Sequence, residues 1–398
     1  MGRTLIALPL VGNEGQMRIL PLSWTGPTGW QPDTLAGEAP DLVLYFGSRQ
    51  SLAESAPFDA LKALCPNAHI MCCSTGGQIH NNEIVDDKIS GVALKFDATR
   101  LKAVSQKVTD AADSRRCGKA IGKALAASDL AGAFVLSDGL HVNGSDLVAG
   151  IASEVGAVPI TGGLAGDGSQ FLETLVGSDH RPESHVVGAI GFYGSAIKIG
   201  HGSAGGWDVF GPKRRITRAM GNVLLELDNQ PALALYERYL GEDEVKGLPS
   251  SALLFPLQIH DPAHPGHEVV RTVLAVDRER KSMTFAGEMP EGWNAQLMRG
   301  TFYRLVDGAA MAATQAREGL QRYRDNDGVA ILVSCIGRRL LMGQRSLEEV
   351  EAAGAALGSQ LHRLGFYSYG EISPNAASGI CDLHNQTMTV TTITEAAA

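Results

Sequence analysis

The chain has 398 residues, and 34 Lys and Arg against 43 Asp and Glu give it a formal net charge of −9. Its hydrophobic fraction of 44% is that of a globular chain, and its length suits two or three domains. No basic run exceeds residues 213–215, which argues against nucleic acid as the main partner. No apolar stretch approaches the roughly 18 residues of a membrane span, so we expect no membrane partner either.

Strand and helix signals alternate along the first half of the chain. Short apolar runs predict strands at residues 1–11, 41–47, 69–73, 89–96 and 132–137, and longer periodic stretches predict helices at 58–64, 111–127 and 147–155. Residues 21–40, which contain four prolines, are expected to form a loop, and residues 161–168 a glycine-rich turn. Residues 186–193 and 196–200 are predicted to pair as a hairpin.

The second half repeats this kind of alternation. We expect strands at 216–227, 251–259, 329–341, 366–372 and 387–393, helices at 232–240, 305–323 and 346–361, and a hairpin from 268–276 and 281–286. The order starts with βαβ units and turns antiparallel later, which predicts an α/β protein with α+β character. It would have two domains, residues 1–215 and 216–398, with mixed β-sheets flanked by helices and a ligand cleft between them or at strand ends.

Cysteine usage points to a reducing compartment. The six cysteines are sparse and form no Cys-x-x-Cys pair, and several lie in strand-like runs: Cys65, Cys72, Cys73, Cys117, Cys335 and Cys381. We therefore expect core thiols in a cytoplasmic protein.

One short segment has an echo later in the chain. Residues 73–79 resemble residues 367–372, and each follows an apolar run. The match is short, but it is typical of two related parts of a fold whose strand-end turns face a shared cleft.

Familiar catalytic motifs are absent from the sequence. It has no Gly-x-Ser-x-Gly elbow, no Walker A loop and no His-Glu-x-x-His helix. The spacing of His260, His264 and His267 is that of some metal sites, but Pro262 and Pro265 prevent a regular helix there, which favours a surface loop.

Two polar features leave alternatives open. Cys381, His384, Asn385 and Gln386 either line a pocket or satisfy the backbone of a turn. His201 lies between two glycines, so its imidazole is either accessible to a large flat ligand or simply faces solvent.

A set of motifs in a fixed order carries a family resemblance that covers nearly the whole chain. The motifs lie at residues 73–79, 161–167, 200–207, 210–218, 225–232, 366–372 and 381–388. Together they resemble the FIST proteins, which have an N-terminal and a C-terminal FIST domain. The chain departs from the family pattern at residues 21–40, where the family usually has a helix.

The resemblance implies a sensory role in bacterial signal transduction. Its stand-alone members include haem-binding nitric oxide sensors that act on a partner histidine kinase. No kinase or cyclase motif follows the second domain, so we expect a stand-alone protein that signals through a histidine kinase or another signalling partner. Our first hypothesis is therefore a haem-based nitric oxide sensor, with His201 and His384 as candidate haem ligands and no other metal.

The second hypothesis is a sensor for an amino acid or a similar polar metabolite. Backbone N–H groups of two turns would hold a carboxylate, and Asp167 or Glu371 an ammonium group. The predicted ligand-binding residues are Ser74, Thr75, Gly76, Gly163, Gly166, Asp167, Trp207, Tyr369 and Glu371.

The third hypothesis, an enzyme, rests on the thiol and imidazole of Cys381 and His384. It is the least favoured, because the family is sensory, and we expect no catalytic residues. The location of the cleft also gives a test: Gly76→Leu or Gly370→Leu should abolish ligand binding without unfolding the protein. If these glycines only serve turns, the same changes should destabilise the fold.

Overall fold

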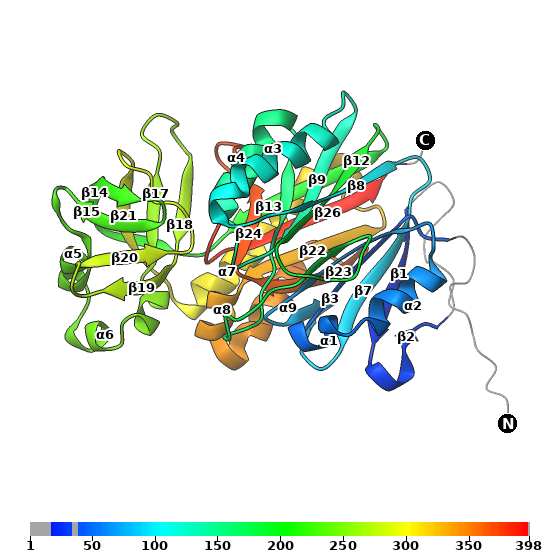
Figure 1. The fold of residues 1–398 in the computed structure, drawn as a ribbon, viewed down its shortest axis with the longest axis horizontal. Coiled ribbons are helices and arrows are strands. Elements are labelled where there is room, and N and C mark those ends of the chain that lie inside the picture. Colours follow the sequence, from blue (N-terminus) through cyan, green and yellow to red (C-terminus); the bar gives the residue numbers. More distant parts are fainter. Residues whose placement is uncertain (1–16, 34–38, 397–398) are drawn as a thin grey trace.

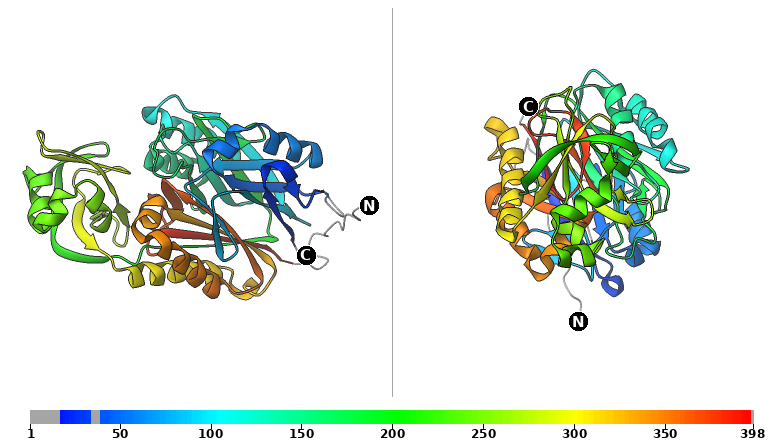
Figure 2. Two further views of the ribbon diagram at one scale, coloured as in Figure 1. Left: turned by 90° about the horizontal axis from the view of Figure 1, so that it is seen from below. Right: turned by 90° about the vertical axis from the view of Figure 1, so that its left-hand side faces the viewer.

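The structure is a computed structural model that describes residues 17–33 and 39–396 (Figures 1 and 2). The strand expected at residues 1–11 lies outside the described residues. The chain forms a large body and a smaller inserted domain, at the left of Figure 1. It leaves the body after β13 (Ile197–Ala204), builds the inserted domain with residues 208–299, and returns through α7 (Phe302–Gly319).

The body contains three six-stranded sheets with the same internal plan. In the middle of each sheet, two parallel neighbouring strands are joined through helices. These pairs are β3 (Leu42–Gly47) with β4 (His69–Ser74), β9 (Leu130–Ser137) with β10 (Ile160–Leu164), and β22 (Gly328–Cys335) with β23 (Leu361–Ser368). The connecting helices are α1 (Arg49–Ala53) and α2 (Ala56–Leu64), then α4 (Gly144–Val155), then α8 (Ile336–Met342) and α9 (Ser346–Leu357).

The remaining strands extend this plan on both sides. The first sheet has the order β11-β4-β3-β7-β1-β2, the second β25-β24-β10-β9-β12-β8, and the third β6-β5-β23-β22-β26-β13. Their bounds are β1 (Arg18–Trp24), β2 (Trp30–Gln31), β5 (Gln78–His80), β6 (Glu83–Val85), β7 (Ile89–Lys95), β8 (Arg100–Lys107), β11 (Val176–Ser178), β12 (Val186–Tyr193), β24 (Gly370–Pro374), β25 (Cys381–His384) and β26 (Met388–Glu395). The body is therefore a pseudo-threefold arrangement of three units.

Each unit donates a strand to another unit. The strand that follows β4 is β5, and it pairs with β23 of the third unit. The strand after β10, β11, pairs with β4 of the first unit, and the strand after β23, β24, pairs with β10 of the second. This cyclic exchange links the three sheets, so none of them is complete with strands of its own unit alone.

The ends of β4, β10 and β23 meet in a set of hydrogen bonds that we call the strand-end ring. The backbone N–H of Gly76 donates to Tyr367 O at 2.9 Å, that of Gly166 to Ser74 O at 2.9 Å, and that of Tyr369 to Leu164 O at 3.2 Å. The two echoing segments of the sequence are thus equivalent parts of the first and third units, and residues 164–166 are their counterpart in the second.

Helices pack against the sheets on the outside of the body (Figure 1). Thr301 caps α7, and Asn143 caps α4 by accepting from the Asp146 N–H. Helix α3 (Ser114–Leu125) lies directly against α4, since a Cβ on Gly118 would be only 2.2 Å from the Leu147 carbonyl oxygen. Small residues here allow two helices to cross closely.

The inserted domain is an antiparallel β-structure with its own apolar core. Its strands are β14 (Asp208–Met220), β15 (Val223–Leu227), β16 (Gln230–Pro231), β17 (Leu257–His260), β18 (Glu268–Arg271), β19 (Val273–Asp277), β20 (Ser282–Phe285) and β21 (Asn294–Arg299), and its helices are α5 (Ala232–Tyr239) and α6 (Glu242–Lys246). Leu224, Tyr236, Ile259 and Phe285 are buried in this core.

The predicted fold class is confirmed: the protein is α/β with mixed sheets, flanking helices and two domains. The domain boundary expected between residues 215 and 216 lies within β14, and the exact position of the boundary stays a prediction. All six cysteines are unpaired and five are buried, as expected of core thiols.

Three local expectations are wrong. β12 and β13 form no hairpin, because β12 pairs with β8 and β9 while β13 crosses to another sheet and pairs with β26. Residues 21–40 are not all loop: Pro21 lies in β1, on a part of the strand that only β7 pairs with, where proline is tolerated. Residues 160–164 are a strand rather than a turn, and Gly162 allows close approach, since its Cβ would be 1.9 Å from Val135 O.

Two predicted strands also contain helix. Residues 250–254 form a 3₁₀ turn before β17, and residues 336–342 form helix α8 directly after β22. Continuous apolar runs do not distinguish a buried strand from a strand followed by a short helix.

Candidate functional site

A cavity of about 230 Å³ lies between the body and the inserted domain. The body contributes residues that follow β9, β10, β22, β23 and β25, and the inserted domain forms the other wall. The cavity is therefore at the carboxyl ends of parallel strands, where open α/β sheets bind ligands. Much of the surface is apolar and includes Leu140, Leu164, Phe171, Phe285, Ile336 and Leu340.

The described residues that line this cavity carry no charge. Their polar members are Asn222, Thr272, Cys335, Tyr369 and Asn385. Burial raises the pKa of the Cys335 thiol far above its usual value, so this group is also neutral. Such a lining suits an uncharged ligand, because a charged one would lose its hydration without gaining an ion pair.

Tyr369 forms part of the wall and is fixed by Asp167. The Tyr369 hydroxyl donates to the Asp167 carboxylate and lies 2.9 Å from Gly168 O, and its ring stacks on Phe171 with centroids 4.6 Å apart. Burial raises the pKa of Asp167, but the Tyr369 hydroxyl and the backbone N–H groups of residues 171–173 lower it more, so the carboxylate stays ionised. Asp167 thereby orders the loop that carries Phe171 to the cavity.

Asn385 is the most unusual polar residue of the site. Its side chain is 0% exposed, and neither Oδ1 nor Nδ2 has a hydrogen-bond partner in the described structure. The turn that carries it is nevertheless held on both sides. Trp207 Nε1 donates to Gln386 O at 2.8 Å, and the Thr387 hydroxyl donates to Glu371 Oε2 at 2.9 Å.

Two polar residues face the cavity from the inserted domain. Thr272 is 4% exposed, and its hydroxyl also lacks a partner in the described structure. Asn222, by contrast, donates from Nδ2 to Phe285 O at 2.8 Å. Of these two side chains, Thr272 therefore has the fully available hydrogen-bonding group.

Glu371 lies beside the site in β24 and is completely buried. Its carboxyl group accepts from the hydroxyls of Ser368 and Thr387. Burial raises the pKa of Glu371 to about 8, with these hydrogen bonds acting in the opposite direction, so the group is mainly protonated at neutral pH. It supports the Asn385 turn and is not among the residues that line the cavity.

Most of the predicted ligand-binding residues are close together, but most do not line the cavity. Ser74, Gly76, Gly166 and Tyr369 belong to the strand-end ring, and Thr75 is in the first of its turns, but of these only Tyr369 lines the cavity. The remaining predicted residues contact neighbouring elements: Asp167 orders the rim loop, Gly163 packs against Val333, Trp207 lies where the chain leaves the body, and Glu371 supports the Asn385 turn.

The predicted haem ligands lie elsewhere. The Nε2 atom of His384 donates to Ser373 O at 2.9 Å, and burial lowers the pKa of this imidazole. His201 is in β13, where Gly200 and Gly202 pack against α7 and the alternation of the strand puts His201 on the other face. Neither lines the cavity, and no other described histidine does. The lining, with no imidazole and a neutral Cys335 thiol, does not fit haem ligation.

The thiol and imidazole of the enzyme hypothesis have different partners. Cys381 Sγ accepts from the Ile160 N–H at 3.4 Å, whereas His384 bonds to Ser373. The loop histidines are also separate: His264 contacts Asp261, and His267 contacts Asp382. Within the described residues there is no cluster of three or more side chains suited to a metal ion.

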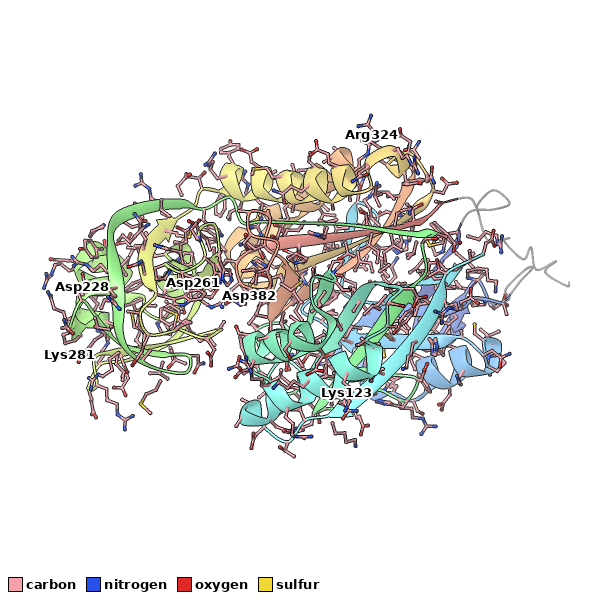
Figure 3. All side chains as sticks on the ribbon, turned by 90° about the horizontal axis from the view of Figure 1, so that it is seen from above. Lys123, Asp228, Asp261, Lys281, Arg324 and Asp382 are labelled. Atoms are coloured by element: carbon pink, nitrogen blue, oxygen red, sulfur yellow. The ribbon has the colours of Figure 1, made fainter. Side chains whose placement is uncertain are left out.

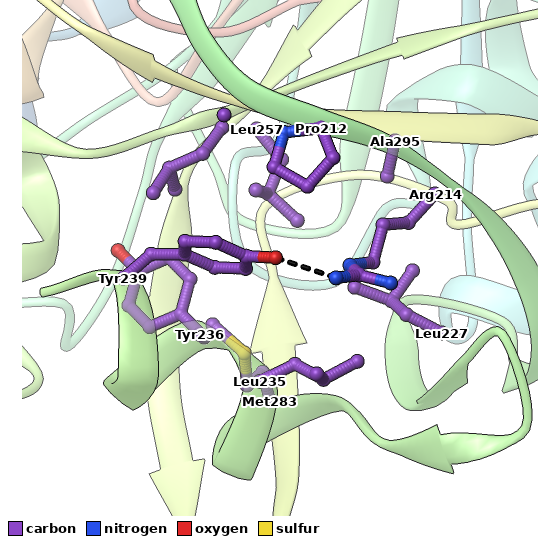
Figure 4. A pocket seen from close by; sticks show the side chains of 11 residues that line it. Pro212, Arg214, Leu227, Leu235, Tyr236, Tyr239, Leu257, Met283 and Ala295 are labelled. Carbon is purple, nitrogen blue, oxygen red and sulfur yellow. Dashed lines mark hydrogen bonds between the residues drawn. The ribbon is translucent and has the colours of Figure 1, made fainter.

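A second pocket is within the inserted domain (Figure 4). It is lined by Tyr236, Tyr239 and apolar side chains, and Arg214 donates to the Tyr239 hydroxyl across it. Its volume is about 30 Å³, which is room for one or two water molecules at roughly 10–15 Å³ each. The larger cavity is therefore the better candidate for a ligand site.

An α/β body with a capping domain and an uncharged, partly open cavity between them is typical of a small-molecule binding protein. Comparison with protein families identifies its kind: the FIST N domain matches residues 41–230 and the FIST C domain matches residues 232–374. The chain belongs to the FIST family, whose domains are sensory domains of signal transduction. No curated protein matches it, and none of its described helices is long and apolar enough to cross a membrane.

Sequence reasoning predicts Tyr369 at the ligand site and leaves open whether Asn385 lines a pocket or serves a turn; the structure places both in the cavity wall. The signal for Asn385 is the pair of neighbouring amide side chains at residues 385 and 386. Nothing local distinguishes Thr272, because its role depends on the placement of the inserted domain against the body.

Proposed function

We propose that this protein is a sensor that binds a small uncharged molecule in the cavity between the body and the inserted domain. The observation that carries this proposal is the cavity itself, which is neutral and largely apolar but includes two buried polar side chains, Thr272 and Asn385, that have no partner among the described residues. Ligand pockets commonly have this composition and this position between domains.

The signal would be the position of the inserted domain. The chain enters and leaves this domain at two adjacent crossings, since a Cβ on Gly206 would be 1.7 Å from Arg304 O. Buried Arg338 donates to Gly205 O and Leu305 O, both at 2.7 Å, and also to Gln386 O beside Asn385. A ligand that contacts Asn385 therefore acts on a turn that shares Arg338 with both crossings.

A second set of polar contacts, which we call the latch, connects the two domains through His267, Arg271 and Asp382. His267 of the inserted domain contacts Asp382 of the body at 2.9 Å, and Arg271 donates to Leu383 O at 2.8 Å. Figure 3 shows Asp382 where the body faces the inserted domain. A bound ligand that changed the spacing of these walls would present a different surface to a partner, which we propose to be a histidine kinase or another signalling protein.

This proposal differs from both expected ligand classes. An amino acid would need charged groups, and the cavity lining has none in the described structure. Haem-based sensing of nitric oxide stays a prediction from the family resemblance, and its test is an absorption spectrum of protein expressed with ample haem. A Soret band would favour that hypothesis over ours.

A cavity-filling variant tests the proposed site. Ala286 lines the cavity from the inserted domain, so Ala286→Leu should remove room for a ligand. Ala355→Leu, on the exposed face of α9, is the matched control. We expect uncharged compounds that raise the melting temperature of the wild type and of Ala355→Leu to have no effect on Ala286→Leu. A compound that stabilises all three equally would place the ligand site elsewhere.

A further inference from the structure

Asn385, at the cavity wall, has an unpaired donor and an unpaired acceptor on one side chain in the described structure. Asn385 lines the cavity, and its side-chain amide is buried and lacks partners at both Oδ1 and Nδ2 among the described residues. Buried polar atoms are almost always paired in folded proteins, because an unpaired group loses its hydration without compensation. Two unpaired atoms on one amide indicate that a bound group completes them.

The amide is held in place rather than free to find a partner of its own. Gln386, the next residue, accepts hydrogen bonds at its backbone oxygen from Trp207 Nε1 and Arg338 Nη1. Thr387, two residues on, bonds to Glu371 through both its backbone N–H and its hydroxyl. A fixed backbone keeps the side-chain amide at the cavity wall, which is the preorganisation expected of a recognition group.

The opposite wall supplies a second free group. Thr272 lines the cavity, and its hydroxyl is buried and has no partner in the described structure. It comes from the inserted domain, whereas Asn385 belongs to the body. A ligand that bonds to both would connect the two domains.

Size and charge restrict the ligand further. The cavity of about 230 Å³ exceeds the roughly 150 Å³ that suffices for benzene in an engineered apolar cavity, so it has room for one ring with a small substituent. No described lining residue is charged, which disfavours carboxylates and ammonium groups.

We infer that the cavity recognises a carboxamide or lactam on a small, uncharged ring, through paired hydrogen bonds with the Asn385 amide and a further bond to Thr272. A ligand C=O accepts from Asn385 Nδ2, and the adjacent ligand N–H donates to Asn385 Oδ1. The ring occupies the apolar part of the cavity. This inference rests on the proposed ligand site and adds the chemical class of the ligand.

Four probe compounds test it on the full chain. Benzamide and 2-pyridone present an adjacent N–H and C=O, acetophenone has the C=O alone, and benzoate is charged. By calorimetric titration and melting temperature, we expect benzamide and 2-pyridone to bind at least about tenfold more tightly than acetophenone and benzoate, because a site built for hydrogen bonds rejects a ligand that leaves its polar groups unpaired.

Variants locate the recognition group. Asn385→Leu should weaken benzamide at least about tenfold while raising the melting temperature of the free protein, because it removes two unpaired buried atoms. Thr272→Val should weaken benzamide less. Ser90→Ala is the matched control. The Ser90 hydroxyl is also buried and has no partner within the described part of the chain, but Ser90 does not line the cavity, so benzamide binding should not change.

Four results would overturn the inference. Three concern binding: equal binding of acetophenone and benzamide to the wild type, wild-type affinity of Asn385→Leu for benzamide, and no binding of any of the four probes. The first two leave the proposed function intact, since the cavity would still bind a ring. If Asn385→Leu lowers the melting temperature, the amide is completed by water or by the fold, and the inference also fails. The comparison of compounds on the wild type does not depend on any variant folding.

Discussion

The body and the inserted domain are stabilised in different ways. The three units of the body exchange strands in a cycle and share the strand-end ring, so each sheet depends on another unit. The inserted domain has a separate apolar core and is attached at two adjacent crossings and a polar latch around Asp382. Ligand binding supplies only a few kcal/mol of free energy. This is enough to change the position of the inserted domain but not to break the strand exchange between the three units.

This difference in attachment indicates that the inserted domain, rather than the body, changes position when a ligand binds. The body provides a fixed wall of the cavity, with Asn385 and Tyr369, and the inserted domain provides a wall that can change position. Changes in the body should therefore alter global stability, whereas changes at the latch should alter the interface alone. Four experiments test this contrast.

The largest effect is expected from the titration of Glu371, a residue of the body. Its pKa is raised by burial to about 8, so the stability associated with its protonated form is complete below the unfolded value of about 4.5 and is lost as the pH rises through 8. The linked change is on the order of 5 kcal/mol. Urea unfolding at pH 5, 7 and 9 should show this loss in the wild type, and Glu371→Gln should lack it. An identical pH dependence in both proteins would contradict the raised pKa.

Arg338→Met should have the next largest effect. Arg338 and Glu349 form a fully buried ion pair, and removing one partner leaves an uncompensated buried charge, at a cost of about 3–5 kcal/mol. The crossings at Gly205 and Leu305 would lose their contacts as well. Chemical denaturation measures the loss. The control is Arg116→Met, which removes an exposed ion pair with Asp113 and should change stability little; a comparable loss in both would refute the argument.

Gly76→Leu tests the strand-end ring. A Cβ on Gly76 would lie 2.4 Å from Ile336 Cδ1, so a leucine must displace a side chain that lines the cavity. We expect a loss of about 2 kcal/mol from overpacking, together with weaker ligand binding. The sequence predicts either lost binding without unfolding or a destabilised fold, and the contact with Ile336 leads us to expect both effects together. A variant with the wild-type melting temperature would show that the ring tolerates added volume.

Asp382→Asn should have the smallest effect on stability and the clearest effect on the interface. Burial raises the pKa of Asp382, but the His267 hydrogen bond and the Arg271 charge lower it more, so a carboxylate is present at neutral pH. Arg271 is 3.7 Å from Asp382 and keeps its hydrogen bonds to Glu288 O and Leu383 O, so loss of the Asp382 charge should cost only about 1–2 kcal/mol. Hydrogen exchange should increase in β18 and β25 and remain unchanged in β9 and β22. Faster exchange throughout the body would contradict an effect confined to the latch.

Local signals in the sequence predicted most elements of the body, because its central strands are continuous apolar runs and three of its helices, α1, α4 and α7, begin at side-chain caps. The exchanged strands were harder to predict, since β5 and β11 have three residues each and their partners lie in other units. The similarity of residues 73–79 and 367–372 did indicate related units, although not the third one. The cavity could not be derived, because Thr272 and Asn385 come together only when the two domains meet.

The cyclic exchange also bears on how the protein is made. Arg363 and Asn81 are hydrogen-bonded although they are 282 positions apart, and β5 can pair with β23 only after the ribosome has synthesised both. During translation the first sheet can take up β11 early, but the second waits for β24 and the third for β26. Exposed sheet edges are aggregation hazards until they are paired. Nascent chains of this protein therefore carry unpaired edges until synthesis is nearly complete, and should depend on chaperones more than chains whose repeats close one at a time.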